Sequence, residues 1–136
     1  MRKQINQVEE FHRAFKQPIR TEPCPFDDSD ENMKDLRFRG RLMLEEVKEW
    51  ITEANYNADI DKRAKELADI LYVVFGTIIT EGLQGTIELV FDEVHKSNMT
   101  KMPYNQIPII SESGKILKPS TYKEPDLSLL KTFYSK

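Results

Sequence analysis

The stretch ELADILYVVFGTIITEG, residues 66–82, decides the fold of this chain. From Ile70 to Ile79 it is apolar around almost the whole circumference of a helix, and a helix without a polar face is buried on every side. Gly82 stands where a helix commonly ends, because glycine readily adopts the left-handed conformation of a C-cap. The stretch therefore predicts a buried helix over about residues 61–81.

Three further helices are predicted around this central one. Apolar residues recur at three- and four-residue intervals over residues 3–16, 31–55 and 86–101, which is the period of an amphipathic helix. Gly40 lies inside the second of these segments, where glycine costs ~1 kcal/mol unless it allows close packing. The central helix is thus the third in a series of four.

The C-terminal segment, residues 102–136, breaks the helical pattern. Isoleucines flank the turn-like residues 111–114, which predicts a small hairpin, and Pro119 and Pro125 predict an extended arm beyond it. We therefore predict an all-α fold, a four-to-five-helix bundle with a C-terminal extended arm or small hairpin.

Length and composition are those of an ordinary soluble domain. The 136 residues fit a single domain, with a helical core over about 3–101 and an arm over about 102–136. Charged residues make up 32% of the chain and the formal net charge is -3, with no basic stripe along any segment. This charge pattern argues against the binding of a nucleic-acid polymer.

The cysteine content and the apolar runs predict a cytoplasmic location. Cys24 is the only cysteine, so an intrachain disulfide cannot form and a reducing compartment is expected. The longest apolar run, residues 70–79, is too short to span a bilayer, and the N-terminus lacks the apolar core of a signal peptide. We expect no membrane partner.

The central helix also predicts self-association. Three neighbouring helices in so small a domain do not readily cover a helix that is apolar on all faces. A homodimer or a homotetramer would cover the remaining surface.

Two pairs of acids stand out on the second and third helices. Glu46 and Glu49 are three residues apart, as are Glu66 and Asp69, so each pair shares one helix face. Consecutive antiparallel helices could bring the pairs together as a nest of four carboxylates. Buried ionised carboxylates cost several kcal/mol each unless a cation compensates, and oxygen ligands favour Mg²⁺, or Mn²⁺ in its place.

A simpler interpretation is a solvated acidic stripe that pairs with lysines. Lys48, Lys62 and Lys65 lie nearby in the sequence and could serve as partners. For Glu45 alone the two interpretations are equally open. The repetition of the acidic pair on both helices, beside the apolar stretch, favours the metal for the other four acids.

Several motifs together resemble a known superfamily. The acids match an ExxE motif at 46–49 and an ExxD motif at 66–69, and further similarity lies in EEFHRAF at 9–15, FDEVHKSNMTK at 91–101 and GKILKPSTYKEPDL at 114–127. The chain resembles the all-alpha NTP pyrophosphohydrolases, a superfamily that contains MazG-type, dimeric dUTPase-type and phosphoribosyl-ATP pyrophosphohydrolase enzymes. The last branch is the most similar.

The resemblance implies a bundle of the all-alpha NTP pyrophosphatase type and a reaction. A nucleoside triphosphate would be hydrolysed between its α and β phosphates to a monophosphate and pyrophosphate, and the expected role is nucleotide-pool house-cleaning. By the family pattern Glu46, Glu49, Glu66 and Asp69 are Mg²⁺ ligands. The resemblance also implies that Glu45 or Glu46 is the catalytic residue that orients the attacking water.

Basic and amide residues are candidates for binding the substrate. Lys96, Asn98 and Lys101 lie near the end of the fourth helix, where the family places such residues, although lysines also suit a helix C-terminus. Arg41 precedes the acids by about one turn and could neutralise phosphate.

Other classes of protein fit the sequence less well. A di-iron protein needs two Glu-x-x-His pairs, and this chain offers one, Glu9 with His12, because Asp92 and not a glutamate stands three residues before His95. The main alternative is a non-catalytic helical oligomer that binds a nucleotide or a metal in a regulatory role. Such a protein would bind Mg²⁺ without turning over any nucleotide.

Overall fold

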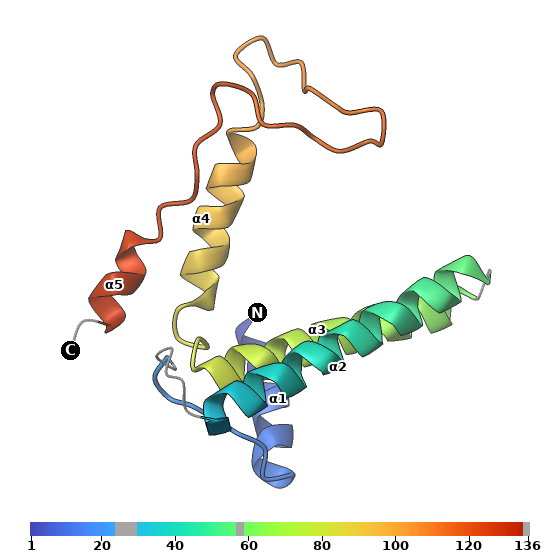
Figure 1. Cartoon of the computed structure of the whole chain (residues 1–136), viewed down its shortest axis with the longest axis vertical. Coiled ribbons are helices and arrows are strands. Elements are labelled where there is room, and N and C mark those ends of the chain that lie inside the picture. The colour runs from blue at the N-terminus through green and yellow to red at the C-terminus, as the bar shows by residue number, and fades with distance from the viewer. Residues whose placement is uncertain (24–29, 57–58, 135–136) are drawn as a thin grey trace. The chain divides into compact units, whose positions relative to one another are not determined.

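The computed structural model describes residues 1–23, 30–56 and 59–134, so the prediction for Cys24 lies outside the described residues. The helices of this part are α1 (Arg2–Ala14), α2 (Asp30–Asn55), α3 (Ile60–Glu81), α4 (Ile87–Met99) and α5 (Ser128–Tyr134) (Figure 1). The all-α fold class is confirmed, and the four predicted helices begin and end within two residues of their expected bounds. None of the described helices is long and apolar enough to cross a membrane.

The chain forms two compact units, Met1–Gly85 and Thr86–Lys136. Two such units can belong to one domain, and we keep the single-domain organisation as a prediction.

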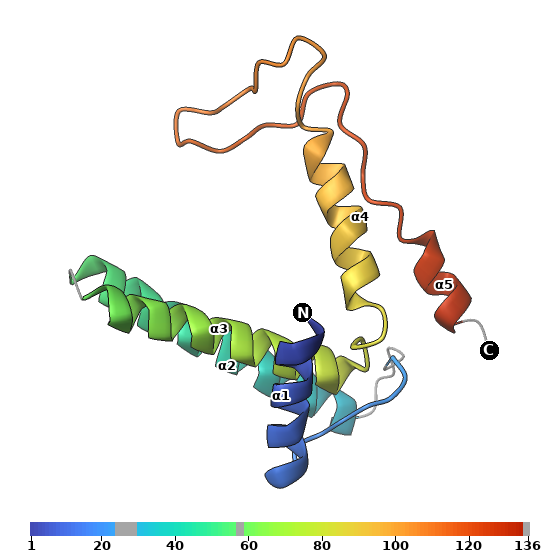
Figure 2. The same ribbon diagram turned by 180° about the vertical axis from the view of Figure 1, so that it is seen from behind.

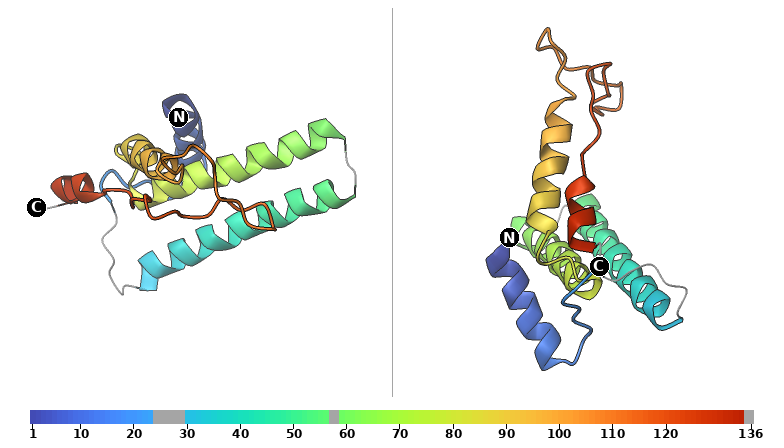
Figure 3. Two further views of the ribbon diagram at one scale, coloured as in Figure 1. Left: turned by 90° about the horizontal axis from the view of Figure 1, so that it is seen from above. Right: turned by 90° about the vertical axis from the view of Figure 1, so that its left-hand side faces the viewer.

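The first unit is built on a pair of long helices. α2 and α3 lie side by side and run in opposite directions, and α1 packs across α3 (Figures 2 and 3). Apolar side chains of α1 and α3 form the buried core: Ile5, Val8, Val73, Phe75, Ile78 and Ile79. The antiparallel arrangement of α2 and α3 is what allows acids from both helices to meet.

The C-terminal end of α3 is fixed by a glycine, as predicted. Gly82 has a φ of 74°, and its N–H donates to the carbonyl of Ile79 at 3.2 Å. A side chain here would also collide with the backbone of Glu22. Both the left-handed conformation and the close chain crossing therefore require glycine at this position.

The burial of α3 is only partly as expected. Ile79 is fully buried, whereas Leu67 is 48% and Leu71 54% exposed in the single chain. These exposed side chains are the surplus apolar surface from which the sequence predicts self-association.

A buried arginine joins α2 to α3. The Arg39 Nε–H donates to Thr77 Oγ1 at 3.2 Å, and its Nη2 donates to the carbonyl of Val73 at 2.6 Å. A Cβ on Gly76 would overlap the Arg39 guanidinium and would lie 2.9 Å from His12 Nε2. Gly76 therefore leaves the space that the guanidinium and the imidazole occupy against α3.

The second unit contains the hairpin that the sequence predicts. Ile110 and Ile116 form an antiparallel bridge, and the Ser111 N–H donates to the Lys115 carbonyl at 2.9 Å. The following chain is fastened to α4, because Ser97 Oγ donates to the Lys123 carbonyl at 2.7 Å.

The prediction of an extended arm to the C-terminus is wrong over Ser128–Tyr134, which form the short helix α5. Asp126 Oδ1 accepts a hydrogen bond from the Ser128 N–H at 2.9 Å and so supports the start of this helix. The prolines that suggested an extended chain all precede it, and no proline lies within it.

Candidate metal centre

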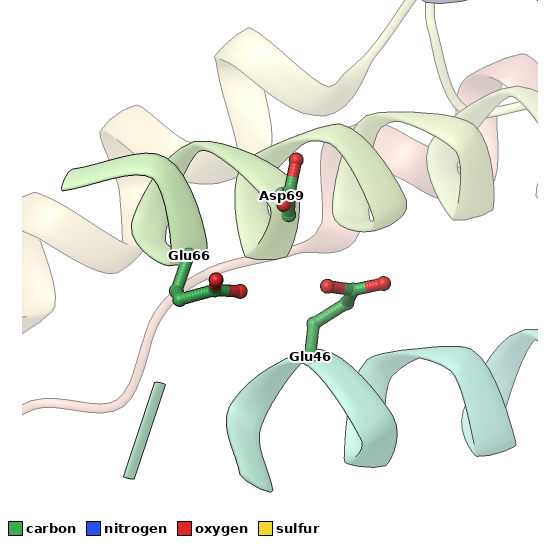
Figure 4. Close-up of side chains that lie close together, drawn as sticks. All are labelled: Glu46, Glu66 and Asp69. Carbon is green, nitrogen blue, oxygen red and sulfur yellow. The ribbon is translucent and has the colours of Figure 1, made fainter. Parts of the chain in front are cut away.

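Three acids meet between α2 and α3. One carboxylate oxygen of Glu46, one of Glu66 and one of Asp69 all lie within 4.8 Å of one another (Figure 4). The three-residue spacing places Glu66 and Asp69 on one face of α3, and the antiparallel packing brings Glu46 of α2 opposite them. The structure thus gathers three of the four predicted metal ligands, here called the acid cluster.

Glu66 is the acid whose surroundings fit a cation best. Its side chain is buried, and its Oε2 has no hydrogen-bond partner among the described residues. A buried carboxylate oxygen without a partner costs free energy that a bound cation would recover. The donor set consists of carboxylate oxygens alone, which is the chemistry that Mg²⁺ and Mn²⁺ prefer.

Lys65 supplies part of the missing positive charge. Its Nζ lies 2.8 Å from Asp69 Oδ2 and 3.1 Å from Glu66 Oε1. Hydrogen bonds to Asp69 and then to Glu66 raise the pKa of the Lys65 ammonium. The lysine-paired interpretation of the acids is therefore realised at Lys65, while Lys48 and Lys62 form no ion pair with the acid cluster in the described chain.

The other acids of α2 remain close to the acid cluster without joining it. Burial raises the pKa of Glu46, and the negative charges of Glu49 and Asp69 raise it further. Glu49 therefore acts on the acid cluster electrostatically, although its own side chain is exposed and lies outside the group of three. Glu45 is exposed as well. The roles of Glu45 and Glu49 stay predictions.

A pocket of about 200 Å³ adjoins the acid cluster in the first unit. Glu46 and Asp69 line one part of it, and the aromatic side chains of Phe11 and Tyr72 line another, with their ring centroids 5.7 Å apart. The pocket therefore places apolar surface directly beside the carboxylates.

Arg39 also lines this pocket, and the sequence analysis missed it in favour of Arg41. A signal was present, because Arg39 precedes Glu46 by seven residues, two turns of helix on the same face. Arg41 lies five residues before Glu46 and is exposed, with its guanidinium 5.9 Å from the centre of the Phe38 ring. The contact of Arg41 with substrate stays a prediction.

His12, beside Arg39, lines the same pocket and is hydrogen-bonded to the chain after α1. Because a carbonyl can only accept, its Nδ1–H donates to the Pro18 carbonyl at 2.8 Å. Burial lowers the pKa of the imidazole, and the nearby charge of Arg39 lowers it as well. A neutral ring thus ties α1 to the chain that follows it.

The substrate-binding residues predicted on α4 belong to the second unit. Lys96 is exposed and pairs with Glu93, which raises the pKa of its ammonium. Asn98 is exposed and Lys101 is half-buried. Their contact with phosphate or sugar stays a prediction.

The helical fold and the acid cluster together define an all-α protein in which two neighbouring helices carry a candidate metal site. The family model of phosphoribosyl-ATP pyrophosphohydrolase matches residues 8–98, which include the whole acid cluster. The chain therefore belongs to this family, a member of the all-alpha NTP pyrophosphohydrolase superfamily, and pyrophosphohydrolase activity follows from that membership. The chain matches no curated protein.

Proposed function

We propose that the protein hydrolyses a nucleoside triphosphate between its α and β phosphates in a Mg²⁺-dependent reaction. The products would be a nucleoside monophosphate and pyrophosphate, and the role would be the removal of unwanted nucleotides. The observation that carries this proposal is the convergence of Glu46, Glu66 and Asp69, with one buried oxygen of Glu66 left without a partner among the described residues.

The residues that would hold the metal come from both helices. Glu46, Glu66 and Asp69 already face one another, and Glu49 would complete the set by turning its exposed side chain toward Glu46. When bound, Mg²⁺ supplies charge neutralisation for phosphate oxygens and lowers the pKa of a bound water. Manganese offers similar coordination and is the expected substitute.

The chain's own residues would supply the remaining chemistry. A carboxylate oxygen of Glu45 or Glu46 would accept the proton of the attacking water and hold it in line with the α phosphorus. Lys96, Asn98, Lys101 and Arg41 would neutralise and orient the phosphates. This division of roles requires no covalent intermediate on the protein.

The test is a pyrophosphate-release assay over a panel of triphosphates with Mg²⁺, Mn²⁺ or EDTA. Phosphoribosyl-ATP belongs in the panel, because the matching family is named for it. We expect turnover that EDTA abolishes and that Glu49→Ala lowers by about 100-fold, as loss of a ligand in direct contact with the metal should cause.

The matched control is Glu10→Ala, which removes an exposed acid of α1 and should leave turnover unchanged. Undiminished activity in Glu49→Ala would remove this residue from the site. Inactivity of the wild type on the whole panel would favour the non-catalytic metal- or nucleotide-binding oligomer.

We also propose that the protein is a homodimer or a homotetramer. The support is the apolar surface that the single chain leaves uncovered, with Leu44 61%, Leu67 48% and Leu71 54% exposed. Sedimentation velocity should show a species of at least two chains. A stable folded monomer across the micromolar range would contradict this expectation.

A further inference from the structure

We propose that Lys65 is a positioning residue that holds the metal-binding carboxylates of α3 together in the metal-free protein and is displaced by the incoming cation. This inference rests on the proposed metal-dependent function and deepens it, because it assigns to a neighbouring side chain the control of metal affinity. The sequence motifs name Glu66 and Asp69 alone, and the sequence offers Lys65 only as an ion-pair partner of the acids.

The geometry places one ammonium between two carboxylates. Lys65 Nζ is 2.8 Å from Asp69 Oδ2 and 3.1 Å from Glu66 Oε1, so a single side chain bridges both acids of α3. Without this bridge two negative charges three residues apart would repel each other. Lys65 compensates them only in part, because Glu66 Oε2 still has no partner within the described chain.

The exposure of the three side chains decides which of them moves. The side chain of Glu66 is 10% exposed and that of Asp69 is 38% exposed, whereas that of Lys65 is 62% exposed and reaches the acid cluster from solvent. A lysine ammonium on a flexible stem can swing back into water at little cost, since exposed ion pairs are weak. Lys65 is therefore the side chain of the three that leaves most easily, and Glu66 the one that moves least.

Displacement has a consequence for affinity. A divalent ion at the acid cluster must break both contacts of Lys65 and then remain near its positive charge, so Lys65 weakens the binding of free metal. Removing the charge should tighten metal binding, which is the opposite of what a residue that merely supports the site would do.

The chain contains a matched control. Lys62 lies one turn before Glu66 on the same helix and lines a surface pocket with Lys65 and Glu66. It forms no ion pair with the acid cluster in the described residues. Loss of Lys62 therefore reports the effect of net charge alone.

The experiment measures the affinity of the full chain for Mn²⁺ without nucleotide, from the electron paramagnetic resonance signal of free Mn²⁺. We expect Lys65→Met to bind Mn²⁺ about tenfold more tightly than the wild type, the factor for removing a unit charge about 6 Å from a divalent ion in water. Lys62→Met should change the affinity by at most about threefold, because a more distant charge is screened. Lys65→Arg keeps the charge, so its affinity for Mn²⁺ should stay close to that of the wild type.

Three results would overturn the proposal. Equal tightening in Lys65→Met and Lys62→Met would show that only net charge matters, and unchanged or weaker binding in Lys65→Met would show that Lys65 does not compete with metal. Either result leaves the proposed hydrolase intact if the wild type binds Mn²⁺ and turns over nucleotide. A wild type that binds no Mn²⁺ would instead contradict the metal centre itself, and the proposed function with it.

Discussion

Glu66→Gln is expected to lower the rate of pyrophosphate release by about 1,000-fold at saturating Mg²⁺, while the protein remains folded. Glutamine keeps the shape of the buried side chain but removes the negative charge whose Oε2 lacks a partner among the described residues. The metal would lose its most enclosed ligand, and with it ~4 kcal/mol of transition-state stabilisation.

Two measurements separate this effect from damage to the fold. The thermal unfolding midpoint of metal-free Glu66→Gln should stay within a few degrees of the wild type, because the side chain keeps its volume. Glu10→Gln, a change of the same kind at an exposed position of α1, should keep full activity. Glu66→Gln with more than a tenth of wild-type activity would place the metal elsewhere.

Gly76→Ala is expected to reduce the free energy of unfolding by about 3 kcal/mol. The added methyl group would overlap the Arg39 guanidinium and press on His12 Nε2, 2.9 Å away. Arg39 is buried and donates to Val73 and Thr77, so it cannot retreat without losing hydrogen bonds from a charged group. Overpacking and the lost bonds together give the expected magnitude.

Gly40→Ala is the matched control, because Gly40 also lies inside a long helix but no atom of the described residues lies within 4 Å of where its Cβ would be. The described part of the chain shows no close packing that would require glycine at this position, so alanine should stabilise the protein by ~1 kcal/mol. Urea unfolding of both variants measures the difference. A loss of stability in Gly40→Ala, or none in Gly76→Ala, would contradict this account of the two glycines.

The parts of the fold that sequence predicts well are those with local causes. α3 is recognisable from the apolar run 70–79 and from Gly82, because helical period and C-cap chemistry act within a few residues. The hairpin at residues 111–114 follows in the same way. α5 was missed because its seven residues lie beyond Pro125, where proline suggested an extended chain.

The candidate site likewise has features with local causes and features that depend on contacts between helices. Helical spacing predicts that Glu66 and Asp69 share a face, and the structure adds Glu46 from the neighbouring helix. One feature depends on contacts between helices and could not be read from spacing alone: the burial of Arg39 against Gly76. The pairing of Lys65 with Glu66 and Asp69 lies within α3, and helical spacing already offers Lys65 as a partner of these acids. A single sequence gives each helix its faces but not which residues of two helices meet.

The hydrogen bonds that Arg39 donates to Val73 and Thr77 affect how closely the carboxylates can approach an ion. These hydrogen bonds join α2 to α3 two turns away from Glu46, so neither helix can slide along the other without breaking them. Contacts outside the acid cluster thus set the distance between Glu46 and the two acids of α3. Selectivity for a small cation over a larger one would then reside partly in a residue that never touches the ion.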